Sequence, residues 1–193
     1  MSEQKRRIRI VREENPSSPR NNDNLGTLVC WHRRHALGDE QPGCEPEAYL
    51  AGLPAGSIVI PVYLMDHSGL SLSVHDFKAS DPSGWDSGQV GFIYCTPQKL
   101  IKEYGADNLT NRETATGCMK SEIEEYAQYL RGEVWGFVVE DWDGCEHCGR
   151  GERIPVDSCW GFIGETLEET GIGTYADGWA TPEELEQAWK DRE

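Results

Sequence analysis

The sequence lacks the motifs of the common nucleotide-binding folds and any long apolar run. It contains neither a G-x-x-x-x-G-K-[ST] phosphate loop nor a G-x-G-x-x-G fingerprint, so nucleotide binding by those two routes is excluded. No apolar stretch approaches the roughly 18 residues of a membrane-spanning helix. The opening segment MSEQKRRIRIVREE has no apolar core, so no secretory signal is predicted. We therefore expect a cytoplasmic protein that does not contact a membrane.

Basic residues are scarce: 18 Lys and Arg face 34 Asp and Glu, a net charge of -16. Six of the basic residues lie in residues 1–20, whereas residues 21–193 hold 12 basic and 31 acidic residues, a net of -19. Such a field repels nucleic acid and attracts basic patches on proteins, although acidity can also serve solubility alone. We expect a protein partner with a basic surface and no direct contact with nucleic acid.

The pattern of turns and apolar runs predicts the organisation of the chain. Residues 1–24, which end in the Pro-, Ser- and Asn-rich NPSSPRNNDN, are interpreted as a flexible basic arm with a short strand at Ile8–Val11. Residues 25–193 are interpreted as a single acidic domain. Strands are predicted at 25–32, 57–65, 69–75, 90–95, 133–140 and 158–164.

Three helices are predicted from capping signals and helical spacing. They cover 97–104 after Thr96, 111–131, and a short segment after the capping box that begins at Thr181. Six strands and three helices with little βαβ alternation favour an α+β fold on a mixed or mainly antiparallel sheet.

Seven cysteines form no secreted disulfide pattern, so reduced thiols are expected, and two of them form a metal-binding motif. Cys145 and Cys148 stand in C-x-x-C spacing before a glycine, which is half of a tetrahedral zinc site. Because no second C-x-x-C exists, two further ligands would have to come from Cys159, His147, Cys30, His32 or His35. A redox pair and a loop without any ligand are the alternatives.

A second group of residues suits catalysis. Cys30 and His32 fall on one side of a predicted strand, the arrangement of a thiol nucleophile and its base. His67, Asp86 and Cys159 lie at strand ends and could join them in one pocket. Buried thiols and local Asx turns explain the same residues without any catalysis.

Several motifs in fixed order resemble a family of small phage and prophage proteins. They are DNLGTLVCWHRRHALGDE (23–40), IPVYLMDHSGLSLS (60–73), WDSGQVGFIYCT (85–96), IKEYG (101–105), EVWGFVVED (133–141) and DSCWGF (157–162). The resemblance implies a mobile-element origin and a bacterial cytoplasm, and it implies no activity.

The leading hypothesis is a phage accessory protein that binds a basic surface of a host nuclease or other nucleic-acid-binding protein. It would mimic DNA and thereby inhibit restriction or CRISPR defence. The alternatives are a small hydrolase-like enzyme using the Cys/His/Asp group and a zinc-stabilised adaptor. The residues expected to meet the partner are acidic ones of the predicted helices: Glu122, Glu124, Glu125, Glu168, Glu169, Glu183 and Glu184.

Overall fold

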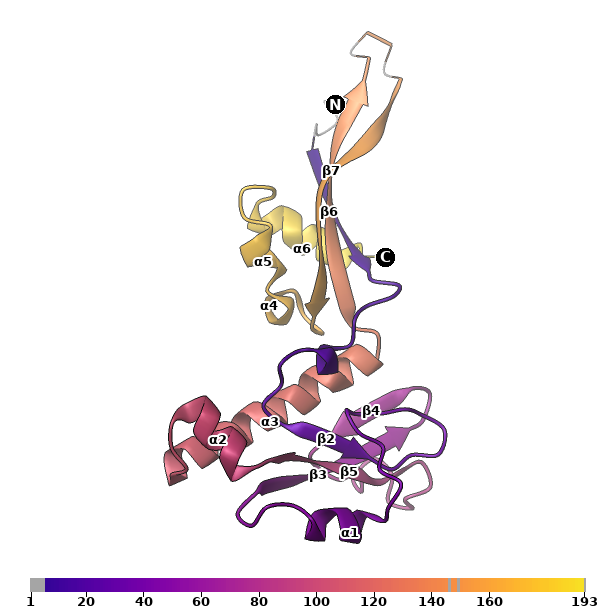
Figure 1. Ribbon diagram of the computed structural model, residues 1–193. Helices are drawn as coiled ribbons and strands as arrows, with labels where there is room; N and C mark the ends of the chain where they lie inside the picture. Colours follow the sequence, from indigo (N-terminus) through magenta and orange to yellow (C-terminus); the bar gives the residue numbers. More distant parts are fainter. Residues whose placement is uncertain (1–5, 146, 149, 193) are drawn as a thin grey trace. The chain divides into compact units, whose positions relative to one another are not determined.

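The computed structural model in Figure 1 describes residues 6–145, 147–148 and 150–192. The chain divides into a central unit, residues 18–131, and a terminal unit built from residues 1–17 and 132–193. Each unit has its own antiparallel sheet and its own helices, which confirms the α+β class. The strands form two sheets in two units, however, and not the single sheet and single domain expected from the sequence.

The central unit carries a four-stranded sheet in the order β2-β5-β3-β4. Its strands are β2 (Thr27–Cys30), β3 (Ile58–Asp66), β4 (Leu70–Ser73) and β5 (Ser87–Cys95). Its helices are η1 (Pro19–Asn21), α1 (Pro46–Ala51), α2 (Pro97–Tyr104) and α3 (Leu109–Leu130).

Helix α3 lies across one face of this sheet and α1 on the other (Figure 1). On the α3 side, Met119 and Ile123 are fully buried together with Ile93 of β5. On the α1 side, the ring of Tyr49 lies 5.8 Å from that of Phe92, which in turn lies 5.4 Å from Trp31. The sheet therefore has an aliphatic face and an aromatic face.

Local signals in the central unit are confirmed. The strands predicted at 57–65 and 69–75 are present as β3 and β4, which form a hairpin with Ser68 at φ 57° in its turn. Thr96 caps α2 by accepting a hydrogen bond from the Lys99 amide, and Gly105 ends that helix at φ 80°. Pro61 lies opposite Phe92 of β5, and on the other side β4 pairs with β3 only from Tyr63 onward, so no described strand lies beside Pro61 on that side.

The terminal unit carries a three-stranded sheet in the order β1-β6-β7. Its elements are β1 (Arg6–Arg12), β6 (Val134–Gly144), β7 (Gly151–Ile163), α4 (Leu167–Thr170), α5 (Ile172–Tyr175) and α6 (Pro182–Lys190). The predicted capping box at Thr181 is present: its hydroxyl accepts from the Glu184 amide at 3.3 Å. Phe137, Ile172 and Leu185 belong to the core beneath these helices.

The N-terminal segment differs from the flexible arm expected from the sequence. Residues Arg6–Arg12 form β1, which pairs along its whole length with β6. Ile8 and Ile10 alternate with arginines and are buried, which is the pattern of a half-buried strand. Burial opposes the charge of Glu140 on β6, but hydrogen bonds from Arg7 and Arg9 outweigh it and lower the pKa of this carboxyl. The basic residues therefore serve strand pairing.

Candidate functional site

Polar side chains meet where β3 ends and β5 begins in the central unit. We call His32, His35, Asp66, His67, Trp85 and Asp86 the strand-end cluster. The His67 Nδ1 lies 2.9 Å from an Asp86 carboxylate oxygen, and the Asp66 amide donates to the Asp86 carbonyl at 2.8 Å. On the other side, Asp66 pairs with Arg34 and lies 3.5 Å from His35 Nε2. His32, Arg34, Asp66, Trp85 and Asp86 line a hollow of about 200 Å³, whereas His35 and His67 do not.

The loop before β5 is organised by one carboxylate, that of Asp81. It accepts from the hydroxyls of Ser83 and Ser87 at 2.7 and 2.9 Å and from the Asp86 amide at 3.0 Å. These hydrogen bonds, that of Ser83 first, lower the pKa of Asp81. The loop holds Trp85 with 89% of its surface exposed. A large aromatic group on an ordered loop is typical of a contact surface.

His32 and His35 stack with their ring centroids 5.0 Å apart. The His32 Nδ1 accepts a hydrogen bond from the His35 amide at 3.2 Å, so this nitrogen carries no proton. Burial, followed by the nearby His35 and Arg34, lowers the pKa of His32. The imidazole of His32 is therefore neutral near pH 7.

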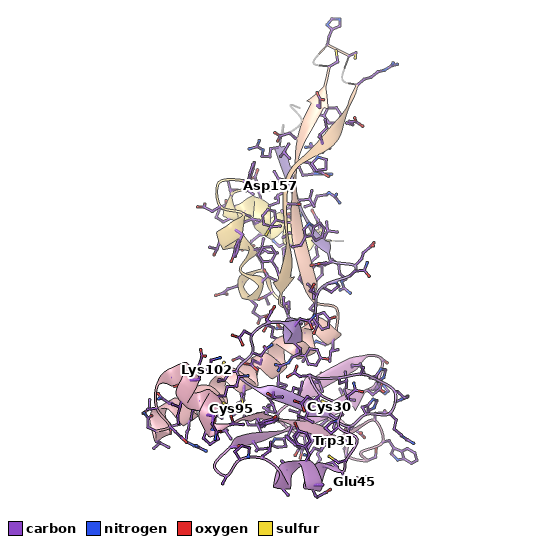
Figure 2. All side chains as sticks on the ribbon, in the orientation of Figure 1. Cys30, Trp31, Glu45, Cys95, Lys102 and Asp157 are labelled. Atoms are coloured by element: carbon purple, nitrogen blue, oxygen red, sulfur yellow. The ribbon has the colours of Figure 1, made fainter. Side chains whose placement is uncertain are left out.

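The thiols expected to act in catalysis do not join this cluster. Cys30 is 1% exposed, and burial raises its pKa from 9.0 to about 12. Cys159 lies on β7 in the terminal unit, two residues after Asp157, and Cys30 lies at the end of β2 in the central unit (Figure 2). The structure thus groups His32, His67 and Asp86 and leaves Cys30 without the properties of a nucleophile.

Burial predicts a difference in reactivity among the cysteines. In a pulse of iodoacetamide at pH 8, we expect the exposed Cys44, Cys145 and Cys148 to be alkylated and the buried Cys30 and Cys95 to be protected. A thiol with a pKa of about 12 is only about one part in ten thousand thiolate at that pH. Peptide mass spectrometry measures the labelling, and denatured protein is the control in which all seven cysteines react. Rapid labelling of Cys30 in folded protein would contradict this assignment.

Cys145 and Cys148 are exposed in the turn that joins β6 to β7. Hydrogen bonds from the backbone of Cys148 and of His147 lower the pKa of the Cys145 thiol. Among the described residues, no group of three or more His, Cys, Asp or Glu side chains is arranged to hold a metal ion. Within the described residues, these two thiols therefore have no third side chain of this kind arranged beside them.

Cys159 does not complete that half-site, contrary to one expectation from the sequence. It faces Phe137 in the strand register, eight residues along β7 from Gly151 at the tip. Eight residues of extended strand span roughly 26 Å. A tetrahedral zinc site has ligand distances near 2.3 Å, so Cys159 is far out of reach.

The acidic residues expected to meet a partner have three different surroundings. Glu122 is buried, contrary to expectation, because its carboxylate accepts from the amides of Leu25 and Gly26 and pairs with Arg20. The exposed Glu169 and the half-buried Glu184 accept hydrogen bonds within helix-capping boxes. The remaining four are exposed: Glu124, Glu125, Glu168 and Glu183. The first two of these lie in the central unit and the last two in the terminal unit.

Sequence reasoning missed Arg34 and Asp81 as parts of the site. Arg34 is the second of two adjacent arginines, and nothing in the neighbouring sequence indicates that it pairs with Asp66. The turn that Asp81 organises could have been predicted from the sequence, since an Asp three residues before a glycine in a polar loop favours an Asx-type turn.

Comparisons with family models, with curated proteins and with solved structures found no match to this chain. Across residues 6–192, apart from 146 and 149, no helix has the length and apolar character required to span a membrane. The site must therefore be interpreted from its own chemistry.

Proposed function

We propose that this chain is a phage-type accessory protein that binds a basic surface of a host protein. The DNA-binding face of a restriction or CRISPR nuclease is the kind of surface that fits. The observation that carries this proposal is the set of exposed carboxylates on helices whose opposite faces are buried. It includes Glu124 and Glu125 on α3, Glu168 on α4 and Glu183 on α6.

The C-terminal helices concentrate this charge. Residues 165–192 contain eight acidic and two basic residues. Leu185 and Ala188 of α6 are buried in the core of the terminal unit, so this helix turns its polar side to solvent. Lys190 pairs with Glu186 on the same helix at 3.7 Å, and it offsets one charge only. The surface that remains is strongly negative.

Carboxylates fixed on folded helices can replace DNA phosphates opposite Lys and Arg. Long-range attraction then speeds association and makes binding depend on salt. Trp85 gives the central unit an exposed aromatic side chain of the kind enriched at interface centres. These features support binding and require no catalytic step.

If the proposal is correct, the complex with the partner protein dissociates when the salt concentration is raised. We expect immobilised chain to capture a nucleic-acid-binding protein from bacterial lysate at 50 mM salt and to lose it at 500 mM. The chain should then displace duplex DNA from that purified partner. In the terminal unit, Glu168→Gln with Glu183→Gln should weaken displacement by roughly three- to tenfold, because interface charge pairs contribute about 0.2–1 kcal/mol or more each.

The matched control removes the same number of charges elsewhere. Glu47→Gln with Glu103→Gln changes two exposed carboxylates on α1 and α2 and should leave displacement unchanged. Equal weakening by both pairs would point to net charge alone. Capture that salt does not affect, or no competition with DNA, would overturn the proposal.

A second candidate, a small hydrolase-like enzyme, is favoured by the pair His67 and Asp86. A carboxylate at Nδ1 orients the imidazole and leaves Nε2 to accept a proton, which is the role of a general base. The base would have to activate water, because the Cys30 thiol is buried. His67→Ala separates the two functions, since it should leave competition with DNA unchanged and abolish any hydrolysis.

A further inference from the structure

Strands β6 and β7 form a long hairpin. Among the described residues, β1 pairs with β6 as far as Asp141. Beyond that residue β6 and β7 continue to pair, with Trp142 facing Arg153 and Gly144 facing Gly151 as the last pair. Figure 1 shows this end reaching beyond α4, α5 and α6 of the same unit.

Side-chain packing and a backbone hydrogen bond order the tip of the hairpin. A Cβ placed on Gly144 would lie 2.4 Å from the indole nitrogen of Trp142, and one on Gly151 would lie 2.9 Å from its ring. The indole therefore covers the glycine pair, as aromatic side chains do where they support glycines in sheets. The Cys145 amide donates to the Arg150 carbonyl at 2.8 Å and closes the turn.

This turn presents two thiols to solvent in metal-binding spacing. Cys145 and Cys148 are both exposed on the turn that joins β6 to β7. Zinc in a structural site takes four ligands, and the described residues of one chain provide two.

We propose that two copies of the chain share one zinc ion between their hairpin tips, each copy contributing Cys145 and Cys148. Four thiols lose their protons to solvent, and the four thiolates complete a tetrahedral site around Zn²⁺ with a net charge of -2. A twofold axis through the metal relates the copies. A second copy is the natural occupant because it presents the same exposed dithiol on the same projecting turn.

Charges near the tip are compatible with this pairing. Asp143 and Glu152 face each other in the last but one residue pair of the hairpin, and Arg150 and Arg153 are close to them in sequence. Because residues of both signs are present, two tips can approach in an orientation that places Arg150 of one copy near an acidic residue of the other. The proposed site uses none of the carboxylates of the proposed function, so the two proposals can fail independently.

The test is a metal titration of the reduced full-length chain followed by a mass measurement. With Co²⁺ as the probe, we expect the intense visible absorption of tetrahedral thiolate coordination, saturating at one ion for two chains. With Zn²⁺, light scattering after gel filtration should shift from the 21.7 kDa chain to twice that mass, and a chelator should reverse the shift.

Variants identify the ligands. Cys145→Ser with Cys148→Ser should abolish both the absorption and the mass shift, and circular dichroism should confirm that the protein still folds. The matched control, Cys44→Ser with Cys118→Ser, removes two other exposed cysteines and should keep both signals. His147→Ala should also keep the stoichiometry. One metal per monomeric chain, no metal binding, or metal-independent dimers would each overturn the shared site.

Discussion

Replacing Glu122 by Ala is expected to destabilise the protein by about 3–5 kcal/mol, because it removes one of the two carboxylates that pair with the buried Arg20 and leaves two buried amides without their acceptor. The Arg20 side chain is 4% exposed, and its Nη1 lies 3.1 Å from Glu122. The same carboxylate accepts from the Leu25 amide at 2.7 Å and from the Gly26 amide at 3.1 Å. Removing it leaves two buried amides and part of a guanidinium unsatisfied.

Urea denaturation followed by tryptophan fluorescence measures this loss. The control is Glu124→Ala, two residues further along α3 on its exposed side, which should change the free energy of unfolding by less than about 0.5 kcal/mol. If the two variants lose similar stability, the carboxylate network is not what joins α3 to the segment before β2.

Gly91→Ala is expected to lower the free energy of unfolding by about 3 kcal/mol, which is the upper end of the range for inserting a group into a packed interior. Gly91 lies on β5 between β2 and β3, opposite Cys30 and Val62. A Cβ there would lie 1.9 Å from the Val29 carbonyl oxygen and 2.9 Å from its carbon. Backbone cannot move aside as a flexible side chain can, so the two strands must separate.

Gly88→Ala provides the matched control because it lies on the same strand with nothing within 4 Å of an added Cβ. It should be neutral or slightly stabilising, since Ala reduces the freedom of the unfolded chain. Thermal unfolding of both variants measures the difference. A Gly91→Ala protein as stable as the control would show that β2 and β5 are less closely paired than described.

Local features of the fold were predictable because they depend on neighbouring residues. The β3–β4 hairpin, the Thr96 cap and the Thr181 capping box each follow from a few adjacent residues. The division into two units was not predictable, because it depends on β1 pairing with a strand more than 120 residues away. The alternation of Ile and Arg in β1 indicates a strand, whereas the positive charge of the segment led us to expect a flexible arm.

The candidate site was predictable in part for the same reason. His67 and Asp86 lie at strand ends, and the antiparallel pairing of β3 with β5 brings those ends together. Burial, in contrast, is a property of the whole core, and no nearby residue indicated that Glu122 would bind Arg20. The same limit applies to Cys30, whose raised pKa comes mainly from burial.

The order of folding follows from where β1 lies in the chain. The terminal unit is discontinuous: its first strand is synthesised before residues 18–131, and β6 follows after them. On the ribosome, the central unit is complete in sequence while β1 still has no partner. Ile8 and Ile10 therefore remain exposed to solvent until Val139 and Phe137, which face them in the sheet, have been synthesised. The arginines that flank these isoleucines keep the waiting strand charged, which protects an unpaired edge from aggregation during synthesis.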